Sequence, residues 1–218
     1  MEDAQPTTLE PPVEQPLDPL VAIWLAPRAT VRRLVDRPEH QGMLLAALGG
    51  VYGALVGAQA NDVGDQGAPL LMLGLAIGLG AAGGLFLLYG GARLIEWIGG
   101  RLGGTANGKE IRTTLAWATV PLLAGLALFA VQLPLYGEEL FLSSTPRIDA
   151  HAWLQFGLVI FIVLRLVTGG WGVVIVVVAL AEVQGFSVGR ALVSLLLAVL
   201  ALAVLAGLLA GPVMLLVR

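Results

Sequence analysis

Residues 188–217, VGRALVSLLLAVLALAVLAGLLAGPVMLLV, contain a single charged side chain, Arg190, in an otherwise apolar stretch. About 20 predominantly apolar residues in a helix are enough to cross the roughly 30 Å hydrocarbon core of a bilayer. The stretch therefore predicts a transmembrane helix. Four more stretches meet the same criterion, at approximately residues 41–60, 69–98, 111–135 and 152–184.

The composition also indicates a membrane protein. The 218 residues are 57% hydrophobic and 12% charged, and the mean hydropathy is +0.88. A soluble domain carries about 25% charged residues on its water-facing exterior. We therefore predict an all-α fold, a polytopic membrane helix bundle whose five transmembrane helices lie within residues 41–218. The chain has no cysteine, which excludes disulfides, thiolate metal sites and a cysteine nucleophile.

Two segments precede the predicted bundle. Residues 1–19 are acidic and proline-rich and lack the basic start and apolar core of a signal peptide, so we expect a disordered tail. Residues 20–40 are predicted to be an interfacial amphipathic segment, with apolar side chains among the acyl chains and arginines at anionic headgroups. These side chains are Leu20, Val21, Ile23, Trp24 and Leu25, and Arg28, Arg32, Arg33 and Arg37. A basic helix docked on the protein's own spans is a compatible alternative.

Basic residues near the span ends predict the orientation. With the N-terminus in the cytoplasm, the cytoplasmic face collects nine basic side chains and the outer face two. We therefore expect a multi-pass protein of the inner (cytoplasmic) membrane, with the N-terminus cytoplasmic and the C-terminus outside. The nine are Arg28, Arg32, Arg33, Arg37, Arg93, Arg101, Lys109, Arg112 and Arg190, and the two are Arg147 and Arg218.

The run GGTANGKE, residues 103–110, imitates a phosphate-binding loop. Gly103, Gly108 and Lys109 fit G-x-x-x-x-G-K, but Glu110 stands where a Ser or Thr would hold magnesium. A working loop also follows a buried strand, and this one follows a predicted membrane helix. We expect a glycine turn that places Lys109 and Arg112 at the cytoplasmic headgroups, with no bound cofactor.

The run GFSVG, residues 185–189, fits the G-x-S-x-G turn that exposes a nucleophilic serine in α/β-hydrolases. It joins two predicted membrane helices, so Gly185 is expected to end one helix and Ser187 to cap the next. A membrane hydrolase that uses Ser187 stays as a remote alternative. His40 and His151 fall on opposite faces in this topology, so no metal site or catalytic residue is predicted.

Arg165 is the most informative single residue. It lies about 18 Å along the helix from Trp153, at 1.5 Å per residue, which places it deep in the fourth span. An arginine there costs at least about 2.5 kcal/mol unless it is paired or hydrated. Pro121 lacks the amide that would bind the carbonyl of Trp117, so this carbonyl is a predicted partner for Arg165.

Glycines near Arg165 add to this candidate site. Gly169 and Gly170 belong to TGGWG, residues 168–172, a run rich enough in glycine to bend the helix. The site has two interpretations, a polar functional site or a structural contact between spans. Small residues also recur every four positions, which predicts close helix packing within the bundle or in a homodimer. They are Gly49, Gly53 and Gly57, and Gly74, Gly78 and Ala82.

Three segments together resemble the Yip-type family, membrane proteins named for interaction with Ypt/Rab GTPases. They are APRATVRRLVDRP (26–38), LGGTANGKEIRTTLAWATVP (102–121) and ALAEVQGFSVGRAL (179–192). The resemblance implies five spans and a cytosolic N-terminus, and it links eukaryotic members to vesicle traffic. The composition, rich in glycine, alanine and arginine, favours a bacterial member.

The sequence supports two candidate functions. The first is a non-enzymatic scaffold or adaptor whose basic cytosolic face contacts anionic lipid headgroups and a membrane or cytosolic protein, without nucleic acid. The second is a transporter or channel for a small solute or ion with a polar site at Arg165, since broken helices near the midplane often line substrate sites.

Overall fold

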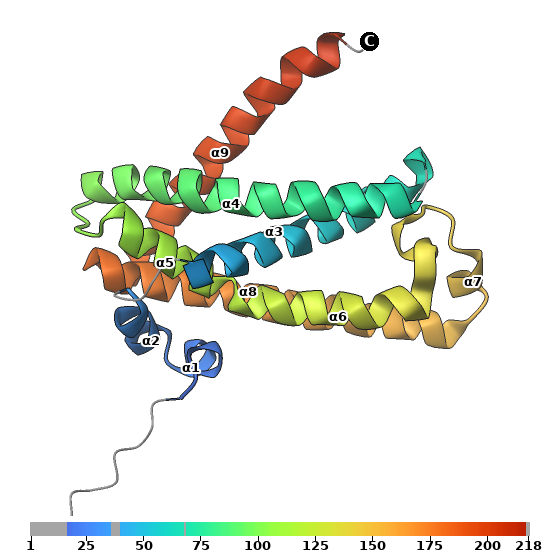
Figure 1. Cartoon of the computed structure of the whole chain (residues 1–218), viewed down its shortest axis with the longest axis horizontal. Coiled ribbons are helices and arrows are strands. Elements are labelled where there is room, and N and C mark those ends of the chain that lie inside the picture. Colours follow the sequence, from blue (N-terminus) through green and yellow to red (C-terminus); the bar gives the residue numbers. More distant parts are fainter. Residues whose placement is uncertain (1–16, 36–39, 68, 217–218) are drawn as a thin grey trace, which may run out of the picture.

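The computed structural model describes residues 17–35, 40–67 and 69–216, and this part of the chain contains helices and loops without a strand (Figure 1). Five of its helical segments are long and apolar enough to cross a membrane. The all-α class with five candidate spans is thus confirmed. The helices of these segments are α3 (His40–Ala60), α4 (Pro69–Arg101), α5 (Gly108–Ala118) continued by α6 (Val120–Tyr136), α8 (Ala152–Gln184) and α9 (Val188–Leu216).

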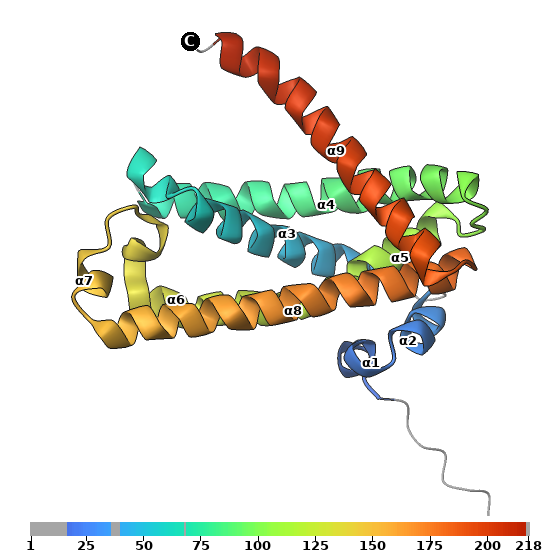
Figure 2. The same cartoon turned by 180° about the vertical axis from the view of Figure 1, so that it is seen from behind.

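Short helices mark the two ends of the bundle (Figure 1). One end, which we name the basic end, holds α1 (Pro19–Leu25), α2 (Pro27–Leu34), α5, the loop 102–107 and the corner 185–187. The other, the acidic end, holds η1 (Val63–Gln66), η2 (Gly137–Phe141) and α7 (Pro146–Asp149). Figures 1 and 2 show α3 beside α4 and α6 beside α8, whereas α9 crosses this bundle obliquely and leaves it.

The third span divides at Thr119 into α5 and α6. Pro121 stands in the first turn of α6, where its missing amide costs no helical hydrogen bond. The Thr119 hydroxyl donates to the carbonyls of Ala116 at 2.6 Å and Leu45 at 3.2 Å. The Thr119 amide also donates to the Ala116 carbonyl, and the Thr119 carbonyl accepts the Leu122 amide, so Thr119 is bonded within the protein, as a break inside a membrane requires.

Helices α3 and α4 meet through glycine, but not through the stripe that the sequence predicted. A Cβ placed on Gly50, Gly80 or Gly84 would collide with the backbone of the opposite helix. By contrast, a Cβ on any of the predicted residues Gly53, Gly57, Gly74 and Gly78 would meet nothing within 4 Å. Of the glycines in the predicted stripe only Gly49 has a close neighbour, since a Cβ there would lie 3.2 Å from the Thr119 side chain. Several sets of small residues in each helix share the four-residue spacing, and only rotation about the helix axis selects the set that packs within the bundle.

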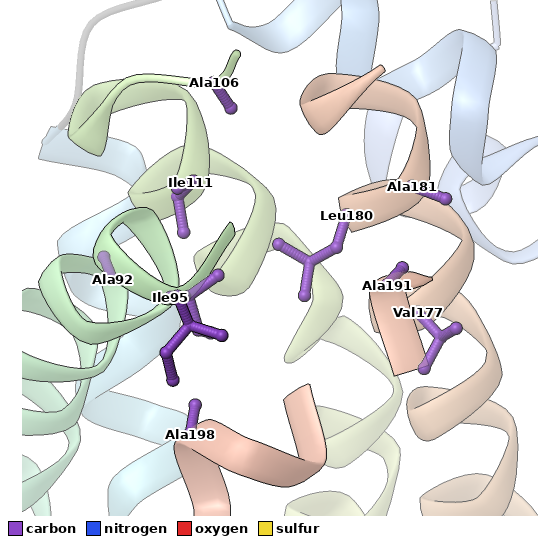
Figure 3. Close-up of a cluster of buried hydrophobic side chains, with 10 residues drawn as sticks. Ala92, Ile95, Ala106, Ile111, Val177, Leu180, Ala181, Ala191 and Ala198 are labelled. Carbon is purple, nitrogen blue, oxygen red and sulfur yellow. The ribbon is translucent and has the colours of Figure 1, made fainter. Parts of the chain in front are cut away.

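The core near the basic end joins four helices. Leu180 of α8 is fully buried and points toward Ile95 of α4 and Ile111 of α5 (Figure 3). Ala191 and Ala198 of α9 complete this cluster. The start of α9 is therefore held by apolar packing, whereas all its residues from Ala203 to Leu208 are exposed.

Candidate functional site

The basic end brings the first and third of the family-like segments into contact through Glu182 of α8. Arg32 of α2 forms an ion pair with this carboxylate, and the Arg28 Nε lies 4.0 Å from it. The carboxylate is 14% exposed, against 55% and 75% for Arg28 and Arg32. The two arginines that were predicted to meet lipid therefore also hold α2 on α8. Nothing in the sequence analysis had pointed to Glu182.

Apolar contacts strengthen this attachment of α1 and α2. Ile23 is 0% exposed and packs in a cluster with Trp117 and Ile175, so its predicted place among acyl chains was wrong. The indole of Trp171 in α8 donates to the Trp24 carbonyl at 3.3 Å. Other apolar side chains of α1 do face outward, namely Leu20, Val21 and Leu25.

Gln184 joins the second family-like segment to the third. Its carbonyl accepts a hydrogen bond from the Thr105 amide at 3.2 Å. Its side chain is 1% exposed and occupies a recess beside Gly99 and Gly104, where a Cβ on either glycine would collide with it. The glycines of this loop thus make room for a glutamine from another helix.

The GGTANGKE run is a helix cap. The Asn107 side chain accepts hydrogen bonds from the amides of Lys109 and Glu110, and Glu110 in return accepts one from the Asn107 amide, which is a capping box. Glu96 of α4 accepts the Gly108 amide at 3.0 Å. These are the amides that a phosphate-binding loop would offer to its ligand, so the run has no free cradle for phosphate.

The GFSVG corner has a structural geometry as well. Gly185 ends α8 with φ of +69°, a left-handed conformation that favours glycine. The Ser187 hydroxyl accepts the Arg190 amide at 3.4 Å, which caps the start of α9. Both local roles expected from the sequence are found here.

The described acids of the basic end are all engaged within the protein. Asp18 caps α1, Glu96 binds the Gly108 amide and Arg93, Glu110 completes the capping box and Glu182 binds α2. The cations outnumber these acids, and several are exposed to the surroundings. Some exposed cations form no ion pair with an acid of the described residues, namely Arg33, Arg101, Lys109 and Arg190. Arg37, a further predicted contact residue, lies outside the described residues.

Aromatic and cationic side chains alternate along one side of α4. Tyr89, Arg93, Trp97 and Arg101 follow one another at four-residue spacing. The guanidinium of Arg101 lies 3.7 Å from the centre of the Trp97 ring. The half-buried Arg112 of α5 places its guanidinium 5.2 Å from the centre of the Tyr89 ring. We name these four side chains of α4 the aromatic and cationic ladder.

Arg165 has a different partner from the one predicted. Its guanidinium donates to the side-chain oxygen of Gln59 at 2.6 Å and lies 4.8 Å from the centre of the Phe129 ring. The Trp117 carbonyl instead accepts the Thr119 amide. The prediction failed because Pro121 packs beside Gly172, seven residues and about 10 Å further along α8 than Arg165.

A buried amide near Arg165 had escaped the sequence analysis. Gln132 stands one helical turn after Phe129, is 0% exposed, and has no hydrogen-bond partner for either side-chain amide atom among the described residues. A glutamine inside the apolar run LFAVQLPL was a sequence signal for this residue. Gln132 and the pair of Arg165 with Gln59 are thus polar side chains within the candidate spans.

The remaining predicted residues lie elsewhere on α8 and the third span. Pro121 packs against Gly172, 3.7 Å from the place of a Cβ there. Gly169 lines a cavity, while Gly170 is exposed. The TGGWG run leaves α8 as one continuous helix. No group of three or more metal-binding side chains occurs in the described parts of the chain.

These features define a polytopic α-helical membrane protein with a basic end and an acidic end. A family model described as the Yip1 domain matches residues 21–210. The chain therefore belongs to the Yip1 domain family, and the resemblance seen in the sequence is confirmed. No curated protein and no solved structure matches it.

Proposed function

We propose that the protein is a non-enzymatic scaffold or adaptor of the inner membrane, with its N-terminus in the cytoplasm and its C-terminus outside. In this proposal the basic end faces the cytoplasm, where it binds anionic lipid headgroups and a protein partner. The observation that carries the proposal is that the three family-like segments meet at the C-terminal end of α8. Glu182 and Gln184 make the contacts that bring them together.

The charge distribution supports contact with an anionic surface. Each described acid of the basic end has a partner inside the protein, so the exposed cations keep their charge for an external ligand. A basic side chain near an anionic membrane surface contributes about 1 kcal/mol to binding. We assign lipid contact mainly to Arg33, Lys109 and Arg190, because Arg28 and Arg32 also hold α2 in place.

Helix α1 supports the same location. Leu20, Val21 and Leu25 of α1 are exposed. Helix α1 contacts α2, and α2 packs on α8. Apolar side chains next to arginines suit the boundary between headgroups and acyl chains. We propose that this face of α1 lies in the cytoplasmic leaflet.

The lipid part of the proposal is tested with native mass spectrometry of protein released from nanodiscs that contain phosphatidylcholine and phosphatidylglycerol. We expect the triple variant Arg33→Gln, Lys109→Gln, Arg190→Gln to retain several-fold less phosphatidylglycerol than the wild type. The matched control carries Arg33→Lys and Arg190→Lys, which preserve charge. Equal retention by all three proteins would refute lipid binding at this surface.

The partner part needs its own measurement. Once a partner is captured with the wild type, its affinity for the purified triple variant is measured in uncharged detergent. A scaffold that uses the basic end loses affinity in the variant and regains it in the charge-preserving control. An affinity that does not respond to these charges would place the partner elsewhere.

A transporter or channel for a small solute or ion is the second candidate, and it rests on Arg165, Gln59 and Gln132. Buried polar groups in a span are a reason to propose a functional site. Solute flux in proteoliposomes that Arg165→Ala abolishes while the fold is kept would favour this function, and flux that survives unchanged would remove its basis. The hydrolase with Ser187 is not pursued, because the serine caps α9.

A further inference from the structure

A cavity of about 550 Å³ lies between the α3 and α4 pair and helices α8 and α9. One wall, from α3 and α4, is mostly glycine and alanine, including Gly53, Gly83 and Gly91, with Leu87, Leu88 and Ile95 of α4. The opposite wall includes Gly169, Val173 and Val176 of α8 and Leu195 and Leu202 of α9.

The cavity exists because side chains are missing from three helices at once. A Cβ on Gly53 of α3, on Gly83 or Gly91 of α4, or on Gly169 of α8 would meet nothing within 4 Å. Protein interiors are otherwise packed as densely as organic crystals, with few voids larger than a water molecule. An open volume of this size is therefore a feature that calls for an occupant.

The chemistry of the walls excludes polar ligands. Thr119 supplies the one side-chain hydroxyl of the lining, and it already donates to the carbonyls of Ala116 and Leu45. The rest of the lining consists of aliphatic side chains and glycine. An ion, a sugar or a nucleotide would lose its hydration there without new hydrogen bonds. The occupant must be a hydrocarbon.

The dimensions distinguish a lipid chain from a helix. The cavity runs along α4 from Gly80 to Ile95, which is about 22 Å at 1.5 Å per residue. The 550 Å³ is the space open to the centre of a water-sized sphere, so a margin of about 1.4 Å on each side widens the mean cross-section from roughly 25 Å² to roughly 55 Å². A helix 10–12 Å wide needs more, roughly 80–110 Å². The space is too narrow for a helix and long enough for an extended acyl chain.

The surroundings supply such a chain. Leu195, Ala198, Val199 and Leu202 are the α9 residues in the lining, and this helix crosses the bundle obliquely and leaves it (Figures 1 and 2), with residues 203–208 all exposed. The walls from α3 and α4 continue to Ala54 and Gly80. The part of the cavity that α9 leaves uncovered faces the bilayer.

We propose that this cavity binds one acyl chain of a membrane phospholipid, which inserts between α4 and α8 from the side of the bilayer. The chain fills the space over the open glycines and packs against Val173 and Val176. It thereby connects the α3 and α4 pair to α8 where protein side chains do not. This inference does not depend on the scaffold function.

The test uses phosphatidylglycerol that carries a photoreactive diazirine in one acyl chain, with the protein in nanodiscs. We expect crosslinks to peptides that contain the open glycines of the lining. In Gly83→Leu and Gly169→Leu the new side chain occupies the cavity, and the yield should fall about tenfold, the effect of roughly 1.4 kcal/mol. The matched controls are Gly78→Leu on α4 and Gly170→Leu on α8, which have open space but lie outside the lining, and they should keep the wild-type yield.

Three other results would overturn the proposal. Equal labelling of all five proteins would mean that no acyl chain enters the cavity. Labelling by a diazirine fatty acid, but not by the phospholipid, would identify a free fatty acid as the occupant. A wild-type dimer that both cavity variants dissociate, measured by light scattering, would assign the cavity to a second copy of the chain. If either leucine variant does not fold, Gly83→Ala and Gly169→Ala replace the pair and should lower the yield less.

Discussion

Two adjacent glycines of α4 have opposite surroundings. A Cβ on Gly84 would collide with the Ala46 carbonyl of α3, whereas a Cβ on Gly83 would meet nothing within 4 Å. The side of α4 that faces α3 is thus packed backbone against backbone, and the next side borders the cavity. Lipid tails are as apolar as leucine, so close contact in a membrane depends on shape and hydrogen bonds. Glycine therefore serves two purposes in α4. At Gly84 it allows close packing against α3, and at Gly83 it leaves open the space of the cavity.

The largest expected effect compares these two positions. Gly84→Leu should destabilise the fold by about 3 kcal/mol or more, because backbone cannot move aside as a flexible side chain can. Gly83→Leu should be neutral or stabilising, since leucine gains helix propensity of up to about 1 kcal/mol over glycine. Thermal unfolding in detergent, followed by tryptophan fluorescence, measures both. Similar losses in the two variants would contradict the distinction between a packed and an open side.

A second comparison contrasts this shape-dependent contact with the charge-dependent contact of α2 on α8. Glu182→Gln removes the charge that faces Arg28 and Arg32, and should cost about 1–2 kcal/mol, since the partners are partly exposed. We expect faster trypsin cleavage after Arg28 and Arg32 in the variant, and in the wild type at high salt. Arg33→Gln is the control that leaves the ion pair intact. A cleavage rate that neither the variant nor salt changes would show that apolar packing alone holds α2.

A smaller effect, a gain in stability, is expected at the buried Gln132. Gln132→Leu should stabilise the protein by about 1 kcal/mol, because it removes a buried amide without partners. Gln59→Leu should destabilise it, since Arg165 loses its hydrogen bond. The melting temperatures of both variants provide the measurement. A loss in Gln132→Leu as large as that in Gln59→Leu would mean that Gln132 has a partner in the membrane, as the transporter hypothesis requires.

The smallest effect is expected at the loop that resembles a phosphate site. Asn107→Ala removes the cap of α5 and should cost about 1 kcal/mol, whereas Asn107→Asp should keep the cap and the stability. Calorimetry of the wild type and the two variants, with and without ATP, distinguishes a helix cap from a phosphate-binding loop. An ATP-dependent rise in melting temperature that only the wild type shows would favour phosphate binding over capping.

Features that depend on neighbouring residues could be predicted from the sequence, whereas contacts between distant residues could not. The spans, the cap at Ser187 and the end of α8 at Gly185 depend on composition or on residues within one turn, and local chemistry determines them. Gln59, the hydrogen-bond partner of Arg165, and the two arginines that pair with Glu182 stand more than a hundred residues away in the sequence. Their identity therefore depends on how the helices rotate and pair. The α3 and α4 contact uses Gly50, Gly80 and Gly84 instead of the predicted stripe for the same reason, because spacing alone does not select the face of a helix.

The aromatic and cationic ladder on α4 has a consequence for the depth at which the protein sits. Tryptophan and tyrosine settle at the level of the headgroups, and arginine extends toward water. A helix that carries both at four-residue spacing resists sliding along the membrane normal in either direction. Because the cavity ends at Ile95, between Arg93 and Trp97, the ladder sets this closed end of the cavity close to one water boundary. The thickness of the surrounding leaflet should then control how far an acyl chain reaches into the bundle.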